Sequence, residues 1–104
     1  MSIEDRIVFE KMLEAMCIAS DFEREELLSH RKNKPQLAPC RFFIWYHLSR
    51  DKRWSLSEIG RAFGRSHATI YHGIQLVDSI ITLHCYDKEQ EIYDEFINNL
   101  CVLL

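Results

Sequence analysis

Apolar residues recur along this chain with the period of an α-helix, and they predict six helices. Leu56, Ile59 and Phe63 stand at i, i+3 and i+7, which places them on one buried helix face. A second stripe of this kind consists of Ile70, Ile74, Val77 and Ile81. The other predicted helices span residues 3–19, 22–28, 39–48 and 87–104. Because no stretch alternates in the manner of a β-strand, the pattern predicts an all-α bundle.

Capping residues divide the segment from residue 55 to residue 83 into two helices joined by a tight turn. Ser55 can cap the first helix, and Glu58 completes the capping-box pattern three residues later. Gly64 follows where a left-handed residue ends a helix at least cost, and Ser66 is a second N-cap. These features predict a helix-turn-helix whose exposed first turn, His67–Thr69, lies where such motifs touch base edges.

The helix predicted at residues 39–48 is apolar nearly all round, which favours a position at the centre of the bundle. Pro39 suits its first turn. Its row of aromatic residues resembles a base-stacking platform. Core packing is the favoured interpretation, because stacking platforms need rings exposed on sheets or in grooves.

The flanking helices are amphipathic. The apolar positions of the first include Ile7, Met12, Met16 and Ala19. Ser20 or Asp21 is predicted to begin the short second helix, whose glutamates suit its positive N-terminal end. The last helix has an apolar stripe and an acidic outer face. That stripe could complete the core of the monomer or pair with a second copy in a homodimer.

Length and charge bound the function. The 104 residues predict a single domain, 1–104, and 47% apolar residues exclude a disordered tail. The net charge of −3 hides a strong segregation: residues 31–65 contain nine basic and two acidic residues, and the remainder contains four basic and fourteen acidic ones. A basic middle between acidic ends is typical of a local phosphate-binding face.

Other chemistry finds no support in the sequence. No secretion signal or bilayer-spanning stretch is present, so a cytoplasmic location is expected. The cysteines Cys17, Cys40, Cys85 and Cys101 lack metal-ligand spacing and are expected to be reduced and mostly buried. The last four residues fit a prenylation pattern, but a buried apolar helix end is favoured. No catalytic constellation emerges, so neither an enzyme nor a cofactor is expected.

The helix-turn-helix resembles the C-terminal DNA-binding domain of the bacterial chromosomal replication initiator DnaA, whose motif reads S-L-x-E-I-G-x-x-F-G followed by R-D-H-T-T-V-x-H-A. The matching residues here are Ser55, Leu56, Glu58, Ile59, Gly60, Phe63, Gly64, Arg65, His67, Thr69, Ile70 and His72. With a similar short helix and basic loop at residues 22–32, the resemblance covers about residues 3–84. It implies a Trp-repressor-like all-α fold, a recognition helix in the major groove and a basic-loop arginine in the minor groove.

The chain departs from the family pattern at several positions. Ser66 replaces the family aspartate, and Ala68 replaces its first threonine. An aspartate at the position of Ser66 can accept a hydrogen bond from cytosine N4, while Ala68 offers only a methyl contact, for example to thymine. The turn is one residue shorter, and Ala38 and Cys40 replace the arginines that flank the family proline. The chain also lacks a G-x-x-x-x-G-K-[ST] loop, so we expect a stand-alone relative without the initiator's ATPase module.

These observations assign roles to individual residues. His67 is expected to contact a base edge, and Ser66 and Thr69 to bind phosphate. Arg65 could reach a guanine or a phosphate. His72 lies about 140° round the helix from His67, so the two cannot share a metal, and it is expected to contact a phosphate or a neighbouring helix. The complete predicted DNA-binding set, with the loop residues assigned to the backbone and minor groove, is Arg31, Lys32, Lys34, Arg65, Ser66, His67, Ala68, Thr69 and His72.

Two functions follow. The first is sequence-preferring binding of double-stranded DNA by a nucleoid-associated regulator that acts in transcription, or on replication, phage or mobile-element DNA. The second is a protein–protein interaction module that kept the fold after losing its DNA contacts; Ser66, Ala68 and the acidic net charge favour it. The two differ in salt dependence, because neutralising phosphates releases counterions.

Overall fold

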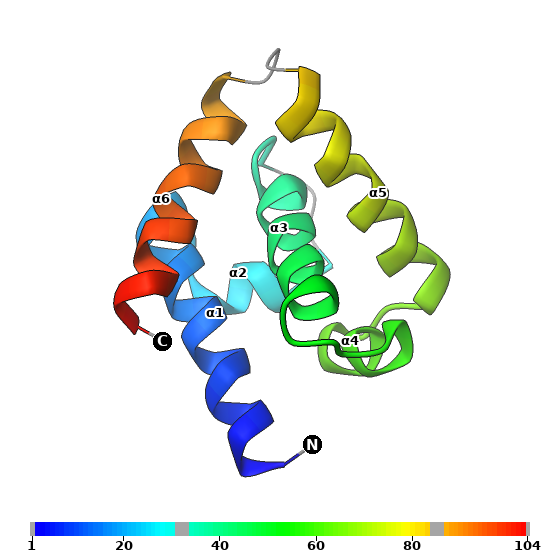
Figure 1. Cartoon of the computed structure of the whole chain (residues 1–104). Coiled ribbons are helices and arrows are strands. Elements are labelled where there is room, and N and C mark those ends of the chain that lie inside the picture. Colours follow the sequence, from blue (N-terminus) through cyan, green and yellow to red (C-terminus); the bar gives the residue numbers. More distant parts are fainter. Residues whose placement is uncertain (1, 31–33, 84–86, 104) are drawn as a thin grey trace.

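The computed structural model describes residues 2–30, 34–83 and 87–103, and these residues form six α-helices and no strand (Figure 1). In chain order the helices are α1 (Ile3–Ser20), α2 (Arg24–Leu28), α3 (Leu37–Arg50), α4 (Leu56–Phe63), α5 (His67–Leu83) and α6 (Asp87–Leu103). The predicted all-α bundle is confirmed. None of the helices in these ranges is long and apolar enough to cross a membrane.

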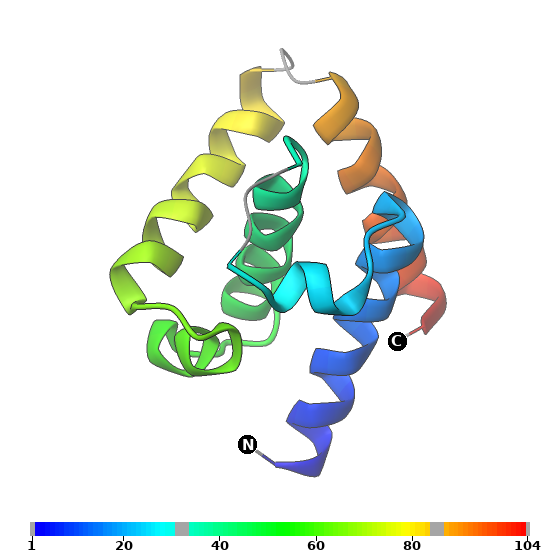
Figure 2. The ribbon, with the colours of Figure 1, turned by 180° about the vertical axis from the view of Figure 1, so that it is seen from behind.

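Helix α3 lies at the centre, with α5 on one side and α1 and α6 on the other (Figure 1). Figure 2 shows α2 crossing between α1 and α3 on the opposite face. Phe43, Ile44 and Trp45 are fully buried in α3, and the Trp45 ring meets Phe63 edge-on with centroids 5.7 Å apart. The aromatic row of α3 is therefore core, as the sequence predicts.

Helix α6 completes the core of the monomer. It packs along α1, with Phe96 and Leu100 buried, and Asn99 Nδ2 donates to the carbonyl of Ala15 at 3.1 Å. The apolar stripe of α6 thus contributes to the core within one chain, and pairing with a second copy stays a prediction.

A polar cross-tie, absent from the sequence prediction, joins α6 to α3. His47 is buried in α3, with Nδ1 against a carboxylate oxygen of Asp51 and Nε2 3.0 Å from the hydroxyl of Tyr93 in α6. Burial raises the pKa of Tyr93. Both ring nitrogens of the buried His47 therefore have a polar partner, and neither is left as a buried, unsatisfied polar atom.

Ile7, one of the apolar positions of the first helix, is 52% exposed, because the first turns of α1 project beyond the body of the molecule (Figure 1). Two details of the sequence prediction are wrong. Asp21 does not begin α2; it ends α1 in the left-handed conformation, with φ of 64°, and α2 begins at Arg24. The last turns of α6 are not a buried end, since Cys101 and Val102 are exposed. Cys40 is buried as expected, Cys17 is partly exposed, and Cys85 lies outside the described residues.

Candidate nucleic-acid interface

The helix-turn-helix forms as its capping residues predict. Ser55 Oγ accepts from the Glu58 amide, and a Glu58 carboxylate oxygen accepts from the Ser55 amide, each at 3.1 Å. These hydrogen bonds to Ser55, the backbone one foremost, lower the pKa of Glu58. Gly64 ends α4 with φ of 66°, a conformation that costs glycine little. The local sequence thus fixes where α4 ends and α5 begins.

The first turn of α5 is open to solvent. Ser66 Oγ accepts from the Thr69 amide at 3.3 Å, and the two hydroxyls lie 3.0 Å apart. Ser66, His67, Ala68, Thr69 and His72 are all exposed. The first amides of a helix have no intrahelical acceptor and carry its positive dipole end, which suits a phosphate.

Two residues of this face are missing from the sequence-based set. Tyr71 and Gln75 follow His67 at i+4 and i+8, so both lie on the same side of α5, and both are exposed. Gln75 Nε2 donates to the Tyr71 hydroxyl at 3.0 Å. Their spacing from His67, off the apolar stripe, is the signal that could have found them. No acidic residue occurs on α5 before Asp78.

The basic loop begins beside the turn between α4 and α5, although Arg31 and Lys32 lie outside the described residues. Lys34 is exposed, forms an ion pair with Glu26 at 2.7 Å and lies 5.3 Å from the centroid of the Phe22 ring. Nearer the turn, a side chain built onto Gly64 would meet the His30 ring at 3.4 Å. The stem of the loop therefore packs against the turn that starts α5.

Arg65 joins the loop to the helix-turn-helix. Its guanidinium donates to the carbonyl of Phe63 at 2.9 Å and to the carbonyl of Ser29 at 2.7 Å. The same group lies 5.6 Å from the centroid of the Trp45 ring, and burial lowers its pKa. The DNA contact predicted for Arg65 stays a prediction, and a guanidinium that reached DNA would have to give up these bonds.

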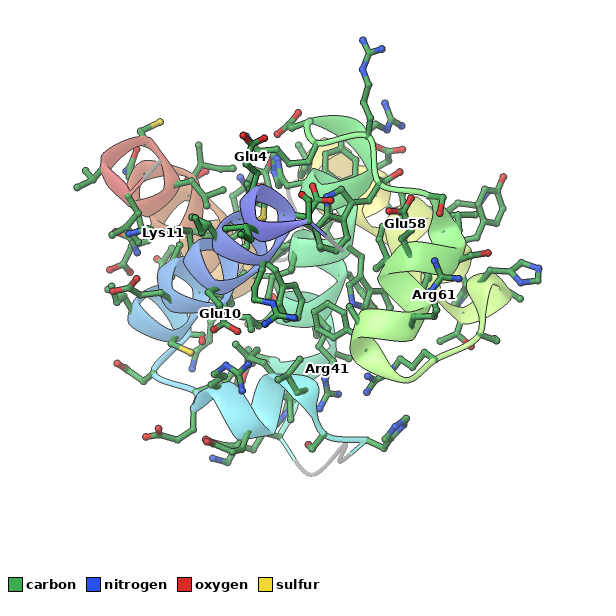
Figure 3. The ribbon with its side chains drawn as sticks, turned by 90° about the horizontal axis from the view of Figure 1, so that it is seen from below. Glu4, Glu10, Lys11, Arg41, Glu58 and Arg61 are labelled. Carbon is green, nitrogen blue, oxygen red and sulfur yellow. The ribbon has the colours of Figure 1, made fainter. Side chains whose placement is uncertain are left out.

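The basic cluster of the sequence is dispersed in the structure. Arg41 is buried beneath α2, whereas Arg61 projects from the outer side of α4 (Figure 3). Arg50 lies over the Tyr46 ring and 3.6 Å from a carboxylate oxygen of Asp78. Sequence proximity placed these cations together, but their helix faces separate them. The exposed positive charges among residues 34–65 are therefore Lys34, Arg50, Lys52, Arg53 and Arg61.

Arg41 acts as an interior cap. Its Nε donates to the carbonyl of Leu27 at 2.9 Å, and its Nη2 donates to the carbonyl of Glu26 at 2.7 Å and to Ser29 Oγ at 3.3 Å. Burial, with a smaller effect of the Arg65 charge, lowers the pKa of Arg41 to about 10. The two arginines together hold the end of α2, and with it the stem of the loop, against the helix-turn-helix.

No group of three or more metal-ligating side chains comes together within residues 2–30, 34–83 and 87–103.

A protein-family model described as the bacterial dnaA protein helix-turn-helix matches residues 9–77 of the 104-residue chain. Neither the curated proteins nor the solved structures include a match to the chain. The matched residues cover most of α1, all of α2 to α4 and most of α5, and leave α6 outside. The chain therefore belongs to the bacterial DnaA C-terminal helix-turn-helix family, whose module binds DNA.

Proposed function

We propose that this protein binds double-stranded DNA with a sequence preference, inserting the start of α5 into the major groove. The observation that carries the proposal is the exposed first turn of α5, with His67 directed to solvent and the loop stem fixed beside it by Arg65. A helix-turn-helix reads base edges with this part of its second helix.

Each part of the interface has a physical role in this proposal. The amides and hydroxyls at Ser66 and Thr69 bind phosphate and fix the register of α5 on the duplex. His67 contacts a base edge, and Ala68 offers its methyl group to a thymine. His72, which is also exposed but lies about 140° round the helix from His67, binds the flanking phosphate.

The basic loop contacts the DNA backbone and reaches the minor groove through Arg31, Lys32 and Lys34. Arginine is favoured in narrow A·T-rich minor grooves, where the negative potential is enhanced. Because Ser66 and Ala68 replace residues of the family motif, we expect duplex binding to survive but not necessarily recognition of the initiator's own box.

We further propose that this helix-turn-helix domain acts at the nucleoid as a regulator of replication or transcription, with no catalytic reaction of its own. The 104 residues contain no phosphate-binding loop of the NTPase type, so the role proposed for them is DNA reading and not nucleotide hydrolysis.

The test is a selection from random duplexes followed by anisotropy titrations at several salt concentrations. We expect log K to fall with log salt at a slope of about −0.9 per neutralised phosphate. Arg31→Ala should lower the affinity for all duplexes alike, whereas His67→Ala should reduce the difference in affinity between the selected and random sequences. Lys88→Ala removes a charge at the start of α6, far from the start of α5 (Figure 1), and should change neither.

Equal losses on all duplexes for His67→Ala would refute its base-reading role. Failure of the wild-type protein to retain any duplex in dilute buffer would refute the whole proposal and favour a protein-interaction module. The ion pairs of Lys34 with Glu26 and of Arg50 with Asp78 favour this alternative, because they lower the positive charge that is available to bind phosphate.

A further inference from the structure

Tyr71 and Gln75 form a polar pair on the exposed side of α5, one helical turn beyond the His67 turn. Gln75 Nε2 donates to the Tyr71 hydroxyl at 3.0 Å, and the Tyr71 side chain is 53% exposed. Neither residue belongs to the hydrophobic core or the apolar stripe that faces α3. The pair therefore has no packing role that would account for it.

The hydrogen bond restricts what the Gln75 amide can present. A glutamine carboxamide carries two N–H donors and one oxygen acceptor, and its terminal torsion is otherwise broad. With one N–H on the Tyr71 hydroxyl, the other N–H and Oε1 remain for a ligand. The amide offers one donor beside one acceptor in a fixed plane.

Adenine matches this arrangement. In the major groove it presents the N7 acceptor next to the N6 amino donor, and glutamine can bond to both at once. Guanine presents acceptors at both N7 and O6, so Oε1 would face an oxygen with no proton between them. A held carboxamide therefore discriminates adenine from guanine more sharply than a freely rotating one.

We propose that Gln75 reads an adenine of the bound duplex and that Tyr71 is a positioning residue that holds the Gln75 amide for this contact. The inference rests on the proposed insertion of α5 into the major groove. The i, i+4, i+8 alignment of His67, Tyr71 and Gln75 supports it, because all three then face the groove from one side of the helix.

The test compares base-preference profiles from random duplexes for the wild type, Gln75→Ala, Tyr71→Phe and Tyr46→Phe. The wild type should prefer adenine at one position by roughly 5- to 150-fold, the range of a bidentate contact. Gln75→Ala should abolish this preference and leave the others. Tyr71→Phe, which removes only the hydroxyl, should reduce it by roughly 2- to 12-fold.

Tyr46→Phe is the matched control, because it removes a hydroxyl from α3, where the ring lies against Arg50. It should leave the profile unchanged. Replacing the selected adenine by 7-deazaadenine removes the N7 acceptor and should weaken the wild type but not Gln75→Ala. Both α5 positions are exposed, so unchanged circular dichroism melting will confirm that the variants fold.

Three results would overturn the inference. A wild type that selects a sequence which Gln75→Ala selects equally well would remove Gln75 from base reading while leaving the proposed function intact. An equal loss of affinity for every duplex in Gln75→Ala and Tyr71→Phe would indicate that the pair contacts phosphate and does not read a base. A wild type that retains no duplex would remove both the inference and the proposed function.

Discussion

Replacing Arg41 by alanine should destabilise the protein more than any removal of a surface charge. The guanidinium is buried, with bonds of 2.9 Å to the carbonyl of Leu27 and 2.7 Å to that of Glu26. Hydrogen bonds that involve a charged group contribute about 1.5–3 kcal/mol each, so the two together contribute roughly 3–6 kcal/mol. Relief of the cost of burying the charge offsets part of this loss.

The net loss should be about 2–4 kcal/mol in the free energy of unfolding. At this chain length such a loss lowers Tm by roughly 10–30 °C. Urea and thermal unfolding, followed by circular dichroism and by the fluorescence of the buried Trp45 and Trp54, will measure it.

Arg24→Ala is the matched control. Arg24 forms an ion pair with Glu10 at 2.7 Å, but both side chains are 48% exposed. Surface pairs of this kind contribute about 0–1 kcal/mol. Arg41→Met adds a second comparison, because it fills the space but leaves the acceptor carbonyls without the guanidinium. A loss for Arg41→Ala no larger than for Arg24→Ala, or an Arg41→Met protein as stable as the wild type, would refute the reasoning.

Other substitutions test the packing around α5 and α6. Gly73→Ala would place a methyl group 2.6 and 2.8 Å from ring atoms of two aromatic residues of α3. The packing cost of about 1–3 kcal/mol should exceed the helix-propensity gain of about 1 kcal/mol, and urea unfolding will measure the net loss. In the control Ser79→Ala, at an exposed position of the same helix, the free energy of unfolding should instead rise. Phe96→Ala should cost about 3–5 kcal/mol, and the loss should not depend on protein concentration; a concentration-dependent loss would mean that α6 also packs against a second copy. Burial raises the pKa of Cys40 to about 12, so this thiol should not react with a thiol reagent at neutral pH, whereas the exposed Cys101 should react. Peptide mass spectrometry will measure the labelling of each cysteine. Rapid labelling of Cys40 in the folded protein would contradict its burial.

The proposed interface is built by two kinds of interaction. Local caps and the glycine turn define α4 and α5, and the arginines Arg41 and Arg65 then hold the loop stem against them. Loss of either arginine should therefore lower DNA affinity through the position of the loop as well as through charge. This separates them from Arg61, which projects from α4 and can act only through its charge or a direct contact (Figure 3).

The sequence alone determined the helices and the helix-turn-helix. The signals of Ser55 with Glu58, of Gly64 and of Ser66 each act within about one helical turn, so the residues that carry them are neighbours in the chain. The exposure of His67 followed from the same logic, because the apolar stripe of α5 fixes which face is buried.

Tertiary structure decided what the sequence left open. Arg65 bonds to a carbonyl 36 residues away, and Arg41 turns inward to one 14 residues away. A count of charges along the chain cannot foresee either contact, since the direction of a side chain depends on which distant helix packs over it. The same holds for α6, whose stripe is satisfied by α1 because the fold brings residues more than 80 apart into contact.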